Sequence, residues 1–236
     1  ADDGRDRHGH EIVVAGSIGP TGELFEPMGA LDHSDALASF TEQAEALAAG
    51  GVDLLWIETM SSLAEVKAAI EAASAVGLPA ASCMTFDTAA RSMMGVTPAD
   101  FASKSIGSGA DYVGANCGIG PAELLHSVSE IITTASVPVI AKGNCGIPAY
   151  LDGAIHYHGT PELMADYACL ARDAGVRIIG GCCGTTPDHV AAMRAALVST
   201  PQYPFDQDQV DAALGPAWKD LPSAADQDSK KRTGGR

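Results

Sequence analysis

The chain of 236 residues has few basic side chains, few aromatic side chains and no long hydrophobic run. Lysine and arginine number 14 against 30 aspartates and glutamates, which gives a formal net charge of −16. A surface this acidic repels phosphate backbones and anionic lipid headgroups, so we expect no nucleic acid and no membrane as partners. No stretch approaches the ~18 consecutive apolar residues that a membrane-spanning helix needs.

The first segment, residues 1–11, is polar and lacks the apolar core of a signal peptide. We therefore expect a cytoplasmic protein with reduced thiols, although its six cysteines would permit disulfides in an oxidising compartment. Apolar residues make up 46% of the chain, which is ordinary for a globular protein and sufficient for a buried core.

A repeated pattern organises residues 12–200. An alanine-rich helical stretch ends at glycine and a short apolar run follows, as at 51–58, 109–116 and 175–181. Similar runs at 12–16, 80–84 and 139–141 bring the predicted strands to six. Helices are predicted between and after them, at 34–49, 63–76, 98–108, 121–135, 161–174 and 187–198. This alternation predicts an α/β protein whose parallel sheet is covered by helices.

Two architectures accommodate this alternation, an open doubly wound sheet and a (β/α)8 TIM barrel. A barrel needs eight units and about 250 residues, so six strands would correspond to a barrel that lacks its first two units. After Pro201 the composition shifts to proline, aspartate and glutamine and then to basic residues. We predict that 201–236 is a largely disordered tail behind the barrel domain of 12–200.

The strongest local signal is the Gly-Gly-Cys-Cys-Gly sequence at 180–184, which contains Cys182 and Cys183 directly after the last predicted strand. Cys117 likewise follows a predicted strand, at 109–116, and one other predicted strand lies between it and the last one. Alternate strands of a barrel contribute to the same inner layer, so these two strand ends should converge. Three thiolates with one open position suit a catalytic zinc ion, which prefers tetrahedral sulfur and nitrogen ligands. The same pattern also fits a vicinal disulfide, a redox pair or small buried side chains.

Other candidate ligands are weaker. Cys145 also follows a strand and competes with Cys117 as a ligand, whereas the remaining cysteines fall inside a predicted strand and a predicted helix and are assigned to the core. His156 and His158 alternate as in a strand or loop, and we interpret them as part of a polar lid. His189 falls in the first turn of a helix, where it contributes to the helix cap.

Several motifs together resemble the homocysteine S-methyltransferase family, which includes betaine–homocysteine methyltransferases and the homocysteine domain of cobalamin-dependent methionine synthase. The resemblance extends from about residue 14 to residue 197 and rests on the sequences at 16–20, 57–59, 114–117, 144–148 and 180–184. It implies a (β/α)8 barrel whose first two strands have no counterpart here. It also implies a Zn²⁺ ion held by cysteines that match Cys117, Cys182 and Cys183.

The resemblance implies zinc-dependent transfer of a methyl group to the thiol of homocysteine, which gives methionine. We favour a small onium donor such as betaine, because no second domain for cobalamin or folate is evident. Trp56 is either part of a cation-binding site or a core residue. The alternatives are an inactive truncated barrel that binds zinc or an amino acid, and a vicinal-thiol redox protein. The sequence does not determine whether the chain forms a homo-oligomer.

Five residues at strand ends are candidates for binding the substrate. Glu58 would hold the ammonium group of homocysteine, or would instead form a structural ion pair or cap a helix. Backbone N–H groups around Gly16 and Ser17 would receive the carboxylate. Asn116 and Asn144 would bond to the substrate or orient the cysteines.

Overall fold

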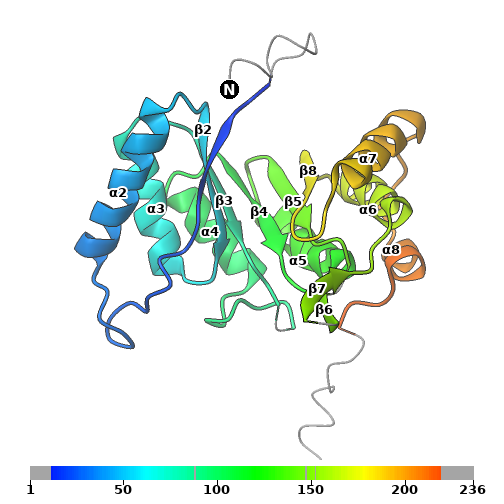
Figure 1. Ribbon diagram of the computed structural model, residues 1–236, viewed down its shortest axis with the longest axis horizontal. Helices are drawn as coiled ribbons and strands as arrows, with labels where there is room; N and C mark the ends of the chain where they lie inside the picture. Colours follow the sequence, from blue (N-terminus) through cyan, green and yellow to red (C-terminus); the bar gives the residue numbers. More distant parts are fainter. Residues whose placement is uncertain (1–11, 88, 147, 152, 219–236) are drawn as a thin grey trace, which may run out of the picture.

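The computed structural model of the protein describes residues 12–218 except 88, 147 and 152. Its main sheet has six parallel strands in the order β1-β2-β3-β4-β5-β8 (Figure 1). Their bounds are β1 Ala15–Ile18, β2 Leu54–Met60, β3 Ala80–Met84, β4 Tyr112–Cys117, β5 Val139–Gly143 and β8 Ile178–Gly181. Strands of this sheet that follow one another in the chain are neighbours, whereas a doubly wound sheet reverses its order at a switch point. The predicted partial barrel is therefore confirmed, as a curled half-barrel.

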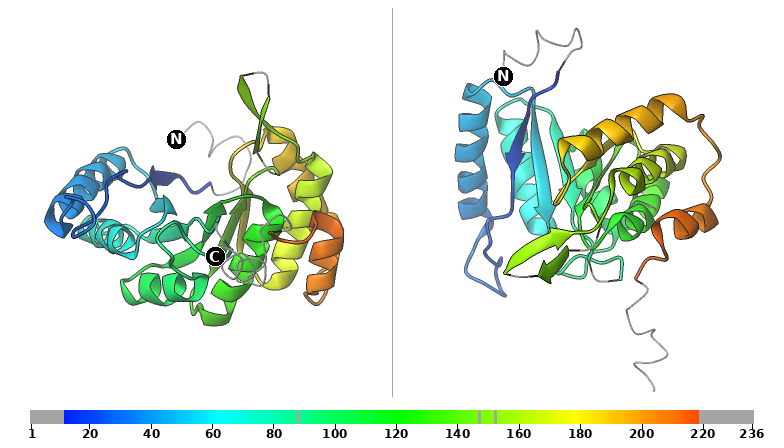
Figure 2. Two further views of the ribbon diagram at one scale, coloured as in Figure 1. Left: turned by 90° about the horizontal axis from the view of Figure 1, so that it is seen from below. Right: turned by 45° about the vertical axis from the view of Figure 1, so that its right-hand side comes forward.

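The helices lie on the convex side of the curled sheet, and its concave side is open (Figure 2, left). A helix follows each strand: α2 His33–Ala49, α3 Leu63–Ala75, α4 Pro98–Gly107, α5 Pro121–Thr134, α6 Pro161–Ala174 and α7 Pro187–Ser199. These bounds agree with the predicted ones to within one residue at each end.

Local chemistry explains where the helices begin and end. Thr97 and Thr160 precede a proline at the first helical position, and their hydroxyls accept a hydrogen bond from a backbone N–H group of the first turn. Helix α6 ends at Gly175, whose φ of 106° lies in the left-handed region that favours glycine. The glycines of the repeated pattern thus turn the chain from helix to strand.

The two faces of the sheet are packed differently. The convex face and its helices form the large core, which includes Leu55, Ile57, Val113, Phe101, Ile131 and Tyr167. The concave face carries a smaller buried cluster of Ala81, Cys83 and Ile140, against which partly exposed Leu54, Trp56, Tyr112 and Ile178 pack. Because a fully buried apolar side chain contributes about 1.5–3 kcal/mol, the convex face dominates the stability of the fold.

A hairpin between β5 and α6 was not predicted. Strands β6 (Pro148–Leu151) and β7 (Ala154–Tyr157) pair antiparallel and form a sheet of their own. The sequence suggested a polar lid here, and His156 and His158 are indeed exposed. The hairpin stands at the edge of the half-barrel (Figure 2).

Residues 201–218 belong to the segment for which the sequence predicts a largely disordered tail, and the structure describes them. They contain helix α8 (Gln207–Leu214), which packs against α6 and α5. Asp206 caps this helix by accepting a hydrogen bond from the N–H group of Asp208, and Val210 is buried. One cap and one apolar anchor hold a segment whose composition is mostly polar. The rest of the predicted tail and the polar segment 1–11 lie outside the described residues.

Among the residues that the structure describes, no helix combines the length and the apolar character needed to cross a membrane.

Candidate metal centre and substrate pocket

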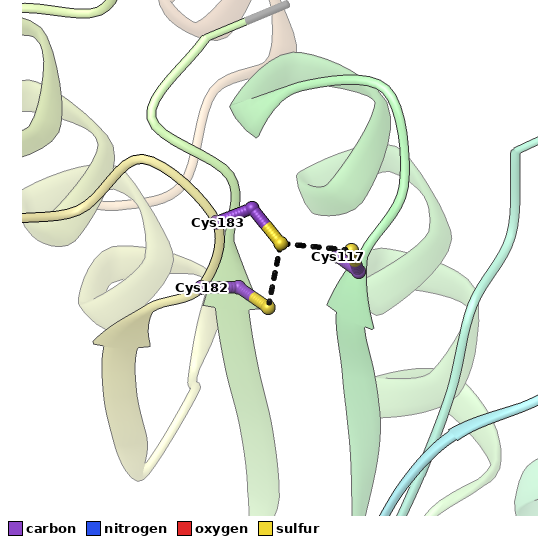
Figure 3. Close-up of side chains that lie close together, drawn as sticks. All are labelled: Cys117, Cys182 and Cys183. Atoms are coloured by element: carbon purple, nitrogen blue, oxygen red, sulfur yellow. Dashed lines mark hydrogen bonds between the residues drawn. The ribbon is translucent and has the colours of Figure 1, made fainter. Parts of the chain in front are cut away.

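Three cysteines meet at the carboxyl edge of the sheet (Figure 3). Cys117 is the last residue of β4, and Cys182 and Cys183 follow β8, with β5 between the two strands. The Sγ atoms of Cys117 and Cys183 are 3.7 Å apart, and those of Cys182 and Cys183 are 4.0 Å apart. All three sulfur atoms lie within 4.8 Å of one another, and all three thiols are free. The structure thus brings together the cysteines that the sequence selected.

The backbone is unusual on both sides of this cluster. Cys117 has a φ of 61°, in the left-handed region that residues other than glycine rarely adopt. Gly184 also has a positive φ, and a Cβ atom there would lie 2.3 Å from Cγ of Tyr157 in the hairpin. A strained conformation such as that of Cys117 persists where the surroundings hold it, and such conformations concentrate at functional sites.

The spacing of the three sulfur atoms suits a zinc ion. Zn–S bonds of about 2.3 Å with tetrahedral angles place two ligand sulfur atoms about 3.8 Å apart. The two separations of 3.7 and 4.0 Å lie on either side of that value. Cys117 and Cys182 are half-buried and Cys183 is exposed. The cluster could therefore hold a metal ion and leave one coordination position facing outward.

Charge in the cluster is shared unequally. A hydrogen bond from Cys117 lowers the pKa of Cys182 to about 5 against the effect of burial, and the positive charge of Lys142 and the amide of Asn116 act in the same direction. The same contact with Cys182, together with burial, raises the pKa of Cys117 above its ordinary value. Between Cys117 and Cys182 the negative charge therefore lies on Cys182 at neutral pH, and binding of a metal would release the proton of Cys117.

Both candidate asparagines hold the segments that carry the cysteines. Asn116 accepts a hydrogen bond from the N–H group of Thr59 at 2.8 Å and donates to its hydroxyl, and its amide nitrogen lies 4.0 Å from Sγ of Cys182. Asn144 accepts from the N–H group of Cys183 at 3.1 Å and donates to the carbonyl of Gly118 at 2.6 Å. Their side-chain contacts thus favour the second of the two predicted roles, orientation of the cysteines.

Glu58 lies in a cavity of about 290 Å³ on the concave face. Its carboxylate accepts hydrogen bonds from Nζ of Lys142 and from the hydroxyl of Ser17, both at 2.7 Å. Burial raises the pKa of Glu58, but these two contacts outweigh it and lower the pKa overall. Nζ of Lys142 also lies 5.0 Å from the ring centre of Trp56. The structural ion pair that the sequence left open is therefore present.

Lys142 was missed by the sequence analysis. It is the polar residue within the apolar strand β5, on the inner face between Asn116 and Gly180 of the neighbouring strands. A lysine inside an apolar strand was the available signal. Its partner Glu58 lies on β2, and only the curvature of the sheet brings the two together.

The remaining candidates are separated by the structure. Ser17 faces the cavity, whereas Gly16 is buried against Leu47 of helix α2. Cys145 does not join the thiol cluster, because its Sγ donates to the carbonyl of Gly159 at 3.0 Å and lies 3.0 Å from Nε2 of His189. Among the described residues, Cys117 rather than Cys145 completes the group.

The fold and the site define an α/β half-barrel with a three-thiol centre at the carboxyl edge of its sheet. The sequence model of one family, homocysteine S-methyltransferase, matches residues 1–197. The chain belongs to the homocysteine S-methyltransferase family, and the resemblance drawn from its motifs is confirmed.

The chain is similar to parts of longer proteins. It is 30% identical over 195 residues to the methionine synthase of Mycobacterium leprae, covering 80% of this chain and 16% of that protein. It is 28% identical over 220 residues to the methionine synthase of Mycobacterium tuberculosis, covering 90% of this chain and 18% of that protein. The chain thus spans less than a fifth of these curated relatives.

A solved structure shares the fold. The homocysteine methyltransferase MmuM of Escherichia coli in its apo form is 26% identical, with a TM-score of 0.63, covering 82% of this chain and 65% of that one. A metallated form of MmuM matches with the same TM-score at 25% identity. The half-barrel therefore corresponds to about two thirds of the MmuM chain.

Proposed function

We propose that Cys117, Cys182 and Cys183 hold a Zn²⁺ ion and that the chain transfers a methyl group to the thiol of homocysteine, giving methionine. The observation that carries the proposal is the sulfur spacing, which suits tetrahedral zinc. The metallated form of MmuM gives further support. The free thiols suit a reducing compartment, and we propose the cytoplasm.

Zinc bound to three thiolates acts as a Lewis acid that lowers the pKa of the homocysteine thiol. A cysteine must be deprotonated to bind the metal, and Cys182 is already a thiolate at neutral pH. The homocysteine sulfur then forms a bond to the methyl carbon of the donor. The donor's own bond to that carbon breaks, and its heteroatom keeps the electron pair. The remaining tasks of the protein are orientation of the reactants and exclusion of water.

In this proposal Glu58 holds the ammonium group of homocysteine. Its carboxylate already binds one cation, the ammonium group of Lys142, at 2.7 Å. Ser17 contacts the same carboxylate, and backbone N–H groups near Gly16 and Ser17 would receive the substrate carboxylate. Asn116 and Asn144 keep the cysteine segments in place while the substrate binds.

The methyl donor in this proposal is a small onium compound such as betaine. The face of Trp56 carries a cation in the structure, the ammonium group of Lys142. A quaternary ammonium group is attracted to an aromatic ring by the same interaction. The cavity lined by Trp56, Glu58 and Lys142 has a volume of about 290 Å³, which is enough for a small molecule.

Metal analysis of the reduced, purified chain tests the proposal. We expect one zinc per chain, loss of the zinc in Cys182→Ser, and retention of it in Cys169→Ser. Cys169 is a matched control, because it is half-buried on helix α6 and outside the cluster. Absence of zinc, or equal zinc in both variants, would overturn the proposal. A reversible loss of two hydrogens on oxidation without any metal would support a vicinal-thiol redox protein instead.

The reaction itself is tested by mass spectrometry. The zinc-loaded chain is incubated with homocysteine and betaine labelled in its methyl groups, and labelled methionine is the expected product. Labelled product from the Cys182→Ser variant at the same rate would contradict the role of the thiol centre.

A further inference from the structure

Cys145 and His189 meet beside the thiol centre without belonging to it. Both are buried, with exposed fractions of 1% and 9%. Sγ of Cys145 lies 3.0 Å from Nε2 of His189, and both atoms contact the carbonyl of Gly159, at 3.0 and 3.2 Å. A buried polar group with all its partners in place is held rigidly. This pair therefore fixes three segments of the chain relative to one another.

The contacts of His189 place its proton on Nε2. The N–H group of Thr186 donates to Nδ1 at 3.1 Å, so Nδ1 must be unprotonated and acts as an acceptor. Nε2–H then donates toward Sγ of Cys145 and the carbonyl of Gly159. An imidazole in this tautomer does not accept the proton of the thiol at Nε2. The pair is therefore not a nucleophile with its general base.

The backbone of Cys183 is hydrogen-bonded to the segment that contains Cys145. Its N–H group donates to Oδ1 of Asn144 at 3.1 Å, and its carbonyl accepts from the N–H group of Cys145 at 2.9 Å. The side chain of Cys183 is exposed. The direction of its Sγ atom therefore depends on how firmly this backbone is held.

These contacts close a ring. The backbone of Cys183 is bonded to Cys145, the side chain of Cys145 to His189, and the imidazole of His189 to Thr186, from which the chain leads back to Cys183. We propose that His189 is a positioning residue of the metal centre, which holds Cys145 against the backbone of Cys183 and thereby directs Sγ of Cys183 toward Cys117 and Cys182. This inference rests on the proposed metal site.

The inference predicts a specific loss when the imidazole is removed. Without the imidazole, Sγ of Cys145 loses the hydrogen bond from Nε2 of His189. The N–H group of Thr186, in the segment 182–186, loses its acceptor Nδ1. Cys182 keeps its own backbone bond to the carbonyl of Gly143 at 2.7 Å. Cys183 should therefore be the ligand that is lost. Contacts that orient metal ligands are worth roughly 10- to 100-fold in metal affinity.

Three variants separate positioning from general destabilisation. His189→Leu removes the donor and the acceptor. His189→Gln retains an N–H group that can reach Cys145, and glutamine is a favoured residue at this third position of a capped helix. His126→Leu is the matched control, because His126 is a half-buried histidine on α5 whose Nδ1 has no hydrogen-bond partner among the described residues.

Cobalt(II) titration of each variant reports the number of thiolate ligands through sulfur-to-metal charge-transfer absorption. We expect His189→Leu to bind cobalt roughly 10- to 100-fold more weakly, with the absorption of two thiolates instead of three. His189→Gln and His126→Leu should behave as the unsubstituted chain. In a Cys183→Ser background, His189→Leu should cause no further loss of affinity. Equal affinities and spectra for His189→Leu and the unsubstituted chain would overturn the inference.

A second measurement needs no metal. Amide hydrogen exchange of residues 182–186 in the metal-free protein should be faster in His189→Leu than in His126→Leu. Unchanged exchange would show that the ring does not hold the loop, and would overturn the inference by itself. If the unsubstituted chain bound no cobalt, the proposed function would fail, while the exchange experiment would still decide whether His189 holds the loop.

Discussion

Cys182 and Cys83 both belong to the inner side of the half-barrel, yet their thiols differ in acidity. Burial raises the pKa of Cys83 far above its ordinary value. The hydrogen bond from Cys117 lowers that of Cys182 to about 5, assisted by Lys142. Because thiolates are the species that bind metals and react with electrophiles, the surroundings decide which cysteine does chemistry.

This difference predicts the pH dependence of alkylation in the metal-free chain. Since the pKa of Cys182 is lowered, its thiolate persists as the pH falls from 9 until about 5, and reactivity should be lost below that value. Peptide mapping after iodoacetamide treatment at several pH values would measure this inflection. In Cys117→Ala the inflection should move up toward the ordinary thiol value of about 8.5. An unsubstituted chain whose Cys182 reacts only near pH 9 would contradict the assignment.

The ion pair between Lys142 and Glu58 predicts a loss of stability. Lys142→Met should lower the free energy of unfolding by about 1–3 kcal/mol, because a half-buried carboxylate loses its charged partner. Lys67→Met is the control, since Lys67 and Glu71 form an exposed pair at 3.6 Å on helix α3 that contributes less than about 0.5 kcal/mol. Urea unfolding measures the free energy of unfolding of both variants. Equal losses would show that the pair between Lys142 and Glu58 contributes no more than an exposed pair.

The meeting of site residues was predictable from the sequence where each residue directly follows an apolar strand. Cys117, Cys182 and Cys183 each follow an apolar run, so their meeting point could be inferred from parallel strands alone. Cys145 and His189 were also singled out, but their contact joins a loop residue after β5 to the first turn of α7, 44 positions along the chain. No periodicity relates that loop to that helix, and this pairing could be learned only from the structure.

Capping chemistry explains where the helices begin, and it can be tested on α6 and α3. The hydroxyl of Thr160 accepts a hydrogen bond from the N–H group of Leu163 at 3.2 Å. Ser62 occupies the same position before α3 but makes no such bond. Thr160→Ala should therefore destabilise the protein by about 1 kcal/mol, and Ser62→Ala by much less. Thermal unfolding compares them, and a larger effect at Ser62 would contradict the role given to the cap.

The elements that were missed are short and mostly polar or exposed. Strands β6 and β7 have four residues each, and their cross-strand pair Tyr150 and Ile155 is exposed. Helix α8 has eight residues, of which only Val210 is buried. Hydrophobic periodicity needs a longer window and a buried face to be detected. The long helices and the apolar strands meet both conditions, and these were placed correctly.

At the scale of the whole molecule, the metal centre and the pocket share Lys142, but their other residues come from different parts of the half-barrel. The three cysteines come from β4 and from the loop after β8, and the ring around His189 lies within the same third of the chain. The cavity beside Glu58, in contrast, opens onto the concave face, where Leu54, Trp56 and Tyr112 are only partly buried. Within the described residues, β1 and β8 are the edges of this sheet.

Extending the sheet beyond β1 by two further β/α units would therefore affect the two functions differently. Zinc affinity should change less than about threefold, because every proposed ligand and its support are already present. The rate of methyl transfer should rise by about 100-fold or more, because a closed barrel excludes water and orients both reactants. Zinc competition with a chromophoric chelator and the labelled-methyl assay measure the two quantities on the same preparations. Equal transfer rates would show that the concave face needs no cover, whereas a large gain in zinc affinity would show that the thiol centre of the shorter chain is not preformed.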